Sequence, residues 1–208
     1  MDIHGFLTTH QLPSSYAETA QKWFTPLCEQ LLKHQEGATK PFIVGINGSQ
    51  GSGKSTLTSF VEYYLSSVHG KQVVSLSIDD FYFDQSQRNA LAIKVHPLLA
   101  TRGVPGTHNI PLALDTLRNL DSGSRTLLPR FDKATDNPFP TEQWPVIASS
   151  PDFIILEGWC VGATPQSQSE LKPPINHLEE VEDPLGIWRS FVNTELAGDY
   201  QTLFAKID

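Results

Sequence analysis

Eight residues near the start of the chain, GSQGSGKS at positions 48–55, fit the pattern GxxxxGK[ST]. Glycines at these spacings let consecutive backbone N–H groups turn inward around a phosphate, and the following lysine and hydroxyl add a charge and a metal ligand. The pattern needs a buried strand before it and a helix after it, because the helix N-terminus supplies positive potential. It therefore constrains the fold as well as the ligand.

Both flanks meet this requirement. PFIVGI at 41–46 is a continuous apolar run bounded by proline and glycine, which is typical of a strand buried on both faces of a parallel sheet. Apolar residues then recur with helical period from Leu57 to Val68, and Gly70 ends that helix. A run rich in β-branched residues follows at 73–78. The sequence predicts an α/β domain of the P-loop NTPase, nucleoside-monophosphate-kinase-like class, with a doubly wound parallel sheet flanked by helices.

The rest of the chain fits one domain over residues 1–208, with a helical extension at 1–40 and the α/β core at 41–208. The other predicted elements are a helix over 14–35, a long loop with at most one short helix over 84–109, a helix from Pro111 to Gly123, an extended segment over 126–131, a buried strand over 152–158, a polar loop over 164–174 and a final helix over 187–203.

Composition excludes several classes of function. Fifteen Lys and Arg against 23 Asp and Glu give a net charge of −8, which argues against a general nucleic-acid surface. The two cysteines, Cys28 and Cys160, lack the spacing of zinc or redox sites and are expected to be reduced thiols. No apolar stretch is long enough to span a bilayer and no targeting pattern precedes the core, so we expect a soluble, cytoplasmic protein without a membrane partner.

The loop residues expected to hold ATP are Gly48, Ser49, Gln50, Gly51, Ser52, Gly53, Lys54, Ser55 and Thr56. Lys54 should reach the β- and γ-phosphate oxygens and so take part in catalysis. Ser55 should bind Mg²⁺, and Thr56 lies where it can contact the α-phosphate. A glycine-rich turn with a solvated lysine is the less favoured structural alternative.

Carboxylates follow both other predicted core strands, at the edge of the sheet where ligands bind. Phosphoryl transfer to an alcohol needs a carboxylate that accepts the hydroxyl proton, and Asp79 is the first candidate, with Asp80 the second. Glu157 ends the later strand and is expected to bind Mg²⁺ together with Ser55, and Asp79 is a third candidate ligand. Each carboxylate could instead cap a turn or form a structural ion pair.

Polar residues in two loop segments are candidates for an acceptor site. They are His96, Arg102, Thr107, His108, Arg130, Asp132 and Lys133. Arginine is suited to a bidentate grip on a carboxylate, so an acidic acceptor would need such a local cluster. For each residue taken alone, a solvated or structural role is equally open.

Five segments together resemble the glycerate 3-kinase group within the uridine kinase, phosphoribulokinase and pantothenate kinase superfamily. They are GINGSQGSGKSTL from Gly45, SIDDFYF from Ser77, HPLLATRGVPGTHNIPL from His96, LPRFDK from Leu128 and ILEGW from Ile155. The resemblance implies that Asp79 is the base. It also implies an acceptor pocket lined by Arg102, Thr107, His108, Arg130, Asp132 and Lys133. We expect Asp80, Tyr82 and His96 to belong to the acceptor site as well.

The function implied by this resemblance is transfer of the γ-phosphate of ATP to a small acid, D-glycerate giving 3-phosphoglycerate. Alternatives are another small acceptor such as pantothenate or a nucleoside, or a nucleotide-binding module without turnover. A GTPase-type switch is weaker, because the chain has no Asn/Thr-Lys-x-Asp segment. Members of the group continue beyond the equivalent of 206–208 into another core strand, an arginine-bearing lid and an adenine-contacting loop, so the resemblance implies a domain truncated at its C-terminal end.

Overall fold

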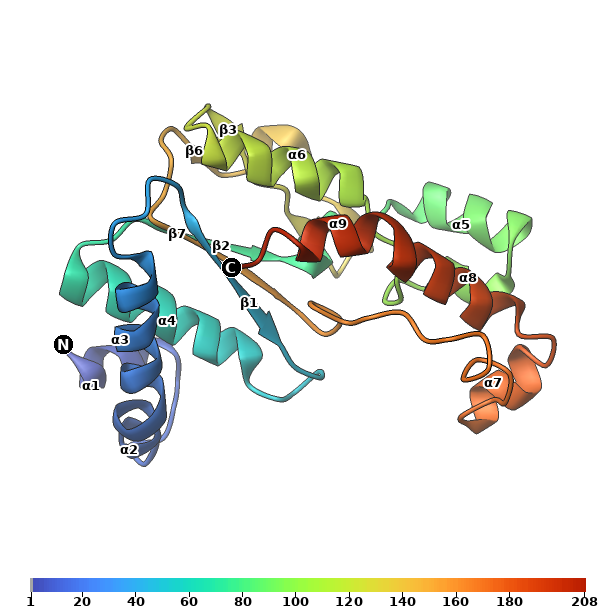
Figure 1. Cartoon of the computed structure of the whole chain (residues 1–208), viewed down its shortest axis with the longest axis horizontal. Helices are drawn as coiled ribbons and strands as arrows, with labels where there is room; N and C mark the ends of the chain where they lie inside the picture. The colour runs from blue at the N-terminus through green and yellow to red at the C-terminus, as the bar shows by residue number, and fades with distance from the viewer. Residues whose placement is uncertain (1) are drawn as a thin grey trace.

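Three parallel strands form the central sheet of the computed structural model, which describes residues 2–208 (Figure 1). They are β1 (Phe42–Asn47), β7 (Phe153–Gly158) and β2 (Val73–Ser77), in the order β1-β7-β2. All three begin and end within a residue or two of the predicted strands. The long gap in sequence between β2 and β7 is filled by segments that lie over the sheet and beyond its carboxyl edge.

Both faces of the central strand β7 are covered, as its continuous apolar run predicted, whereas β1, at the edge of the sheet, is only partly buried, contrary to the prediction. Along β7, Phe153 and Ile155 pack into one core cluster, whereas Ile154 and Leu156 pack into the other. All four are at most 1% exposed. Period-2 alternation sends these side chains to opposite faces, so the positions from Phe153 to Leu156 are all apolar and a polar side chain returns only at Glu157.

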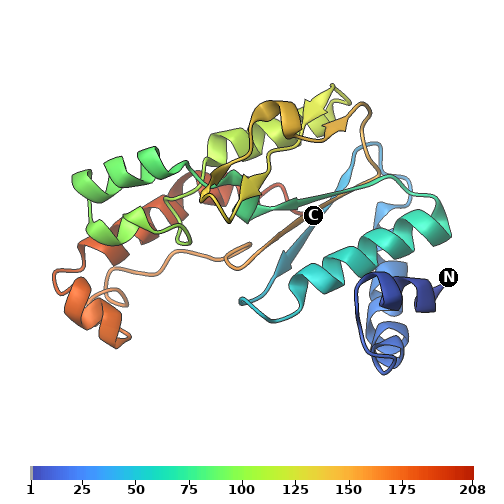
Figure 2. The ribbon, with the colours of Figure 1, turned by 180° about the vertical axis from the view of Figure 1, so that it is seen from behind.

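Helices supply the other half of each core (Figure 2). On one face lie α4 (Lys54–His69) and α3 (Thr25–Gln35), and on the other lie α6 (Ile110–Asp121) and α9 (Gln201–Phe204). Helix α4 begins at the phosphate-binding loop and ends at Gly70, which adopts φ 66°. Helices on both sides of a parallel sheet confirm the predicted fold class.

The N-terminal extension is helical over most of its length, and Met1, its first residue, lies outside the described part of the chain. The predicted helix over 14–35 is present as α2 (Tyr16–Thr19), a π-helical turn η1 (Ala20–Phe24) and α3. A further helix, α1 (Ile3–Thr9), was not predicted. Its buried residues Ile3, Phe6 and Leu7 have helical spacing, and the Phe6 ring lies 5.4 Å from that of Phe60 on α4.

The segment 84–109 differs most from its prediction. It contains a full helix, α5 (Gln85–Lys94), followed by a 3₁₀ turn, η3 (Pro97–Ala100). Asp84 starts α5 with a capping box that includes Gln87. Because the buried residue of this helix is Arg88, apolar periodicity could not reveal it.

Short elements complete the chain between and after these helices. They are the 3₁₀ turn η2 (Ile78–Phe81), strand β3 (Thr126–Leu127) paired with β6 (Val146–Ile147), strand β4 (Phe131–Asp132) paired with β5 (Asn137–Pro138), and the 3₁₀ turn η4 (Thr141–Gln143). The predicted final helix is present as α8 (Ile187–Glu195), a π-helical turn η5 (Leu196–Tyr200) and α9, and a short helix α7 (His177–Glu182) precedes it.

Both cysteines are buried free thiols, as predicted. Burial raises the pKa of each thiol to about 12, so neither is a nucleophile at neutral pH. Among the described residues, no helix combines the length and the apolar character needed to cross a bilayer.

Candidate active site

Three groups of functional residues meet at the carboxyl edge of the sheet. The phosphate-binding loop follows β1, Glu157 lies one residue before the end of β7, and Asp79 comes two residues after β2. In the strand register Glu157 lies between Ile46 of β1 and Ser77 of β2. Segments far apart in the sequence therefore converge because parallel strands end at the same edge.

The phosphate-binding loop has the backbone that its glycines permit. Gly51 and Gly53 adopt φ 78° and 88°, values that side chains with a Cβ rarely adopt, and Gly53 is the N-cap of α4. A Cβ on Gly48 would lie 2.5 Å from the Ser52 Oγ atom. The first turn of a helix 16 residues long thus faces the loop with unpaired N–H groups, which suits an anion.

Lys54 and Glu157 lie together behind this loop. The Lys54 Nζ atom is 3.8 Å from Glu157 Oε2, and the two side chains are 18% and 12% exposed. Glu157 Oε2 is buried and has no hydrogen-bond partner among residues 2–208. A buried carboxylate oxygen with only a distant ammonium group beside it is suited to a cation or to water held by one.

Asp79 accepts hydrogen bonds at both carboxylate oxygens. Lys133 Nζ donates to Oδ2 at 2.7 Å, and the Tyr82 hydroxyl donates to Oδ1 at 3.2 Å. Burial opposes ionisation, but these bonds and the Lys133 charge outweigh it and hold the pKa of Asp79 below its ordinary value. Asp79 is therefore an ionised carboxylate at neutral pH.

Asp80, its neighbour, faces a different partner. Its carboxylate accepts from Arg130 Nη1 at 3.3 Å and from the backbone N–H of Phe131 at 3.1 Å. Burial raises the pKa of Asp80 despite the Arg130 charge. Asp80 and Arg130 thus join the turn after β2 to β4 and hold each other, rather than lining the cavity described next.

A cavity of about 730 Å³ lies beside Lys54 and Asp79. Its lining residues are Ser49, Gln50, Lys54, Asp79, Tyr82, Ala100, Thr101, Arg102, Gly103, Val104, Lys133, Asp136 and Trp159. Seven of these were predicted as site residues, from four separate segments of the sequence. The phosphate-binding loop, the candidate base and two cationic side chains thus share one space.

Besides Asp80 and Arg130, four other predicted acceptor residues do not line this cavity. Thr107 and His108 are 0% and 3% exposed and lie behind its wall. The Thr107 hydroxyl bonds the backbone of Gly103 and Val104, and the His108 ring stacks on Tyr82 with centroids 4.2 Å apart. These two residues hold the wall in place.

His96 and Asp132, the other two, make local contacts. His96 accepts from the backbone N–H of Leu98 and lies 3.9 Å from Asp183. Asp132 accepts from the backbone N–H of Ala134 and from the Thr135 hydroxyl, which fixes the turn that carries Lys133.

Six lining residues were not predicted as site residues, among them Asp136 and Trp159. Trp159 directly follows β7, and its ring N–H donates to the carbonyl of Gly103 at 2.9 Å. Asp136 lies three residues after Lys133 in the same turn, with φ 59°. The signals available were the tryptophan of the ILEGW segment and an Asp-Asn-Pro turn sequence after Lys133.

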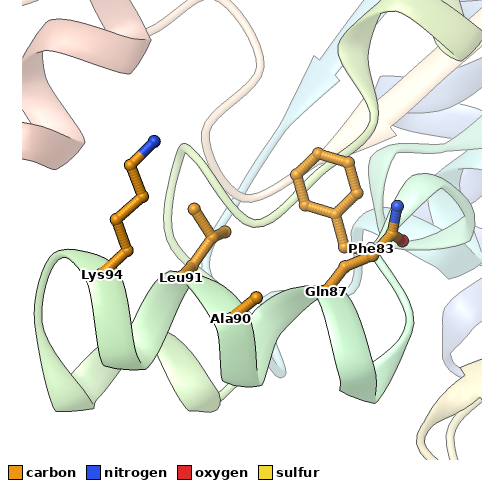
Figure 3. Close-up of a pocket in the computed structure, with 5 residues that line it drawn as sticks. All are labelled: Phe83, Gln87, Ala90, Leu91 and Lys94. Carbon is orange, nitrogen blue, oxygen red and sulfur yellow. The ribbon is translucent and has the colours of Figure 1, made fainter.

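A second hollow of about 300 Å³ lies on α5 (Figure 3). Phe83, Gln87, Ala90, Leu91 and Lys94 line it, and Figure 3 shows that most of them project from one side of that helix. It brings together no carboxylate, nucleophile or phosphate-binding loop. The larger cavity is therefore the candidate active site.

Comparisons with known proteins point the same way. The model of the phosphoribulokinase / uridine kinase family matches residues 43–164. An uncharacterized kinase of Schizosaccharomyces pombe, mug58, is 34% identical over 197 residues, which is 88% of this chain and 69% of that protein. The chloroplastic D-glycerate 3-kinase of Arabidopsis thaliana is 28% identical over 155 residues, or 70% of this chain. This chain spans only 34% of that relative's length.

Among solved structures, a D-glycerate 3-kinase from Cryptococcus neoformans aligns with a TM-score of 0.73 and 27% identity. The alignment covers 91% of this chain and 71% of that one. The family match includes the phosphate-binding loop, Asp79, the cavity wall and Glu157. The chain therefore belongs to the phosphoribulokinase / uridine kinase family.

Proposed function

We propose that this chain is an ATP-dependent kinase that phosphorylates a hydroxyl group of a small carboxylic acid, with D-glycerate as the first candidate. One observation carries the proposal: Lys54 of the phosphate-binding loop and the ionised Asp79 line the same cavity. A γ-phosphate held by the loop and a hydroxyl held by Asp79 would meet there. Positioning of this kind supplies much of the catalysis in phosphoryl transfer.

The proposed reaction needs only one proton acceptor. Asp79 takes the proton of the acceptor hydroxyl while that oxygen forms a bond to the γ-phosphorus of ATP. The bond from the γ-phosphorus to the β,γ-bridging oxygen breaks, and ADP leaves with the electron pair. Lys54 stabilises the negative charge that is spread over the transferred group.

Magnesium fits the residues present. Mg²⁺ takes one or two protein carboxylates and keeps several waters, so it does not need a dedicated cluster. The described residues contain no group of three or more His, Cys, Asp or Glu side chains placed to hold a metal. Ser55 and the buried, unbonded Oε2 of Glu157 would hold the ion and neutralise charge on the phosphates. Asp79 is less suited to the metal, because both its oxygens already accept hydrogen bonds.

The acidic acceptor is supported by the cavity and by two relatives. Arg102 and Lys133 bring positive charge to the cavity that the phosphate-binding loop also lines. The two relatives described as D-glycerate 3-kinases match this chain over 70% and 91% of its length. A hydroxy acid such as D-glycerate offers its hydroxyl to Asp79 and its carboxylate to Arg102 and Lys133.

The test is ADP release from Mg·ATP by this chain with D-glycerate, pantothenate or uridine, together with an ATP-binding titration. Stimulation by D-glycerate alone is expected. ATP binding without stimulation by any acceptor would support a nucleotide-binding module instead, and absence of ATP binding would refute both.

An Asp79→Asn variant tests the base directly. Loss of the proton acceptor should lower kcat by about 10²–10⁴-fold, with the Kd for ATP nearly unchanged. Asp115→Asn is the matched control, because Asp115 forms only an exposed ion pair with Arg118. Turnover by Asp79→Asn at the wild-type rate would exclude Asp79 as the base.

A further inference from the structure

Two arginines share one carboxylate on the wall of the candidate active site. Arg88 Nη2 donates to Asp136 Oδ2 at 2.7 Å and to the Asp136 carbonyl at 2.9 Å. Arg102 Nη1 donates to Oδ1, the other oxygen of the same carboxylate. Arg88 is fully buried, whereas the side chains of Arg102 and Asp136 are 30% and 28% exposed and line the cavity.

Arg88 is fixed from two sides. It projects from α5, whose first turn is held by the Asp84 capping box. The N-terminus of α5 is also tied to the turn that carries Asp136, because the Gln85 N–H donates to Asn137 Oδ1 at 3.0 Å. Within residues 2–208, Asp136 provides every hydrogen-bond acceptor that the Arg88 side chain uses. The guanidinium group and the carboxylate are therefore held at a set position relative to each other.

The charges on the cavity wall do not balance at this point. Lys133 is paired with Asp79, and Lys54 lies beside Glu157. Among residues 2–208, Asp136 is the only carboxylate paired with Arg88 and Arg102, so these three residues carry one excess positive charge. Arg88 cannot reach the cavity because it is fully buried, and the excess is therefore presented to a ligand by Arg102.

We propose that Arg88 and Asp136 are positioning residues that hold Arg102 so that it binds the carboxylate of the acceptor. With that carboxylate on Arg102, the acceptor hydroxyl faces Asp79 across the same cavity. Arginine suits this role because its planar fork binds carboxylates through two parallel N–H groups. Asp136 leaves part of the Arg102 fork free, since only Nη1 is bonded to it. This inference rests on the proposed function and identifies the part of the site that selects acids.

The first test is Asp136→Asn, which removes the charge but keeps the shape. Asparagine also tolerates the φ of 59° found at this position. D-Glycerate binding is measured by calorimetry with a non-hydrolysable ATP analogue present, and KM and kcat are measured in parallel. We expect the Kd and KM for D-glycerate to rise about tenfold or more, while the Kd for ATP stays unchanged. Asp115→Asn is again the control.

Asp136→Asn also leaves the buried Arg88 without its counter-charge, which destabilises a fold. The double variant Arg88→Met/Asp136→Asn removes both charges and should recover thermal stability relative to the single variant. Its KM for D-glycerate should nevertheless stay raised, because nothing then holds Arg102. Recovery of both stability and KM would show that the pair is merely structural and would overturn the inference.

Measurements on the wild-type protein distinguish failure of this inference from failure of the proposed function. If the wild type binds and phosphorylates D-glycerate, and Asp136→Asn does so with the same Kd and KM, only the role of Arg88 and Asp136 is refuted. If the wild type binds ATP but neither D-glycerate nor any other small hydroxy acid by calorimetry, both proposals are refuted.

Discussion

The Nζ atom of Lys133 lies 2.7 Å from Oδ2 of Asp79, the carboxylate proposed as the general base. The two residues come from different turns, one after β2 and one between β4 and β5. Burial by itself would raise the pKa of Asp79, and the ammonium group reverses that effect. Because the Lys133 side chain is 62% exposed, it can exchange Asp79 for a bound ligand. Lys133 thus favours the ionised form of the proposed base.

Replacing Lys133 with methionine should move the pH dependence of turnover. Without the ammonium group, burial dominates and the pKa of Asp79 rises, so a larger fraction of the base is protonated at acid pH. The acid limb of the pH–kcat profile should shift to higher pH. Steady-state ADP release measured from pH 5 to pH 9 would show the shift.

Lys172→Met serves as the control for Lys133→Met, because Lys172 is exposed and does not line the cavity. Its pH–kcat profile should overlay that of the wild type. A Lys133→Met profile that also overlays the wild type would show that Lys133 does not set the protonation of the base.

Glu157→Gln should weaken the use of Mg²⁺. The substitution keeps the size of a buried side chain but removes the negative charge beside Lys54. The Mg²⁺ concentration for half-maximal activity should rise about tenfold or more, in the range seen when groups around a metal site are altered. Titration of ADP release with MgCl₂ at constant ATP measures this directly.

The exposed Glu142 provides the control for Glu157→Gln, since Glu142→Gln changes the same charge far from the cavity. Its Mg²⁺ dependence should equal that of the wild type. A normal Mg²⁺ dependence in Glu157→Gln would remove Glu157 from the proposed metal site.

The sheet and the first half of the site could be predicted because each rests on a local pattern. Apolar runs at 41–46 and 152–158 predict two core strands, and β7 is buried on both faces as expected, whereas β1 lies at the edge of the sheet and is only partly buried. Once the strands are parallel, the phosphate-binding loop, Asp79 and Glu157 must lie at one edge. No long-range contact had to be known to place these three groups together.

The acceptor wall could not be predicted residue by residue, because burial of polar groups depends on partners distant in sequence. Both His108 and Arg102 are basic residues in the same predicted loop, so the sequence does not distinguish them. In the structure His108 is buried against Tyr82, whereas Arg102 lines the cavity. One short helix was allowed within the predicted loop at 84–109, but α5 could not be placed there because its core-facing residue is Arg88. The partner of Arg88 is Asp136, 48 residues away, and that distance hides the pairing from local analysis.

Gly106 should be hard to replace. It adopts φ 97°, and a Cβ there would lie 2.6 Å from Phe191 Cε1 and 3.0 Å from Glu195 Cγ. Gly106→Ala should therefore lose about 2–4 kcal/mol of unfolding free energy, from left-handed backbone strain together with overpacking. Urea denaturation measures this loss.

A substitution at Gly37 separates backbone strain from overpacking, because Gly37 has φ 77° but no atom lies within 4 Å of an added Cβ. Gly37→Ala should lose only the backbone contribution of about 1 kcal/mol. Equal losses in the two variants would mean that α8 does not pack against the wall at Gly106.

His108 should make the stability of the fold depend on pH. It is 3% exposed, its ring stacks on Tyr82, and its Nδ1 atom lies 2.6 Å from the Tyr200 hydroxyl oxygen. Burial lowers its pKa to about 3, despite the opposing charge of Asp79. In the unfolded chain an ordinary histidine has a pKa of about 6.5. Between these two values the unfolded state binds a proton that the folded state does not, so stability falls as pH falls through that window.

When the pH is lowered from 8 to 5, His108 alone should lower the free energy of unfolding by about 2 kcal/mol. His108→Gln should remove that part of the pH dependence, whatever its own stability at pH 8, because the comparison is a difference between two pH values for each variant. His177→Gln is the control, since the His177 side chain is 88% exposed. Urea denaturation of all three proteins at both pH values tests the effect. The contradicting result is a His108→Gln variant that loses as much stability as the wild type between pH 8 and pH 5. That result would mean that His108 takes up its proton in the folded state. The cavity wall behind Tyr82 would then be more accessible to water than its burial indicates.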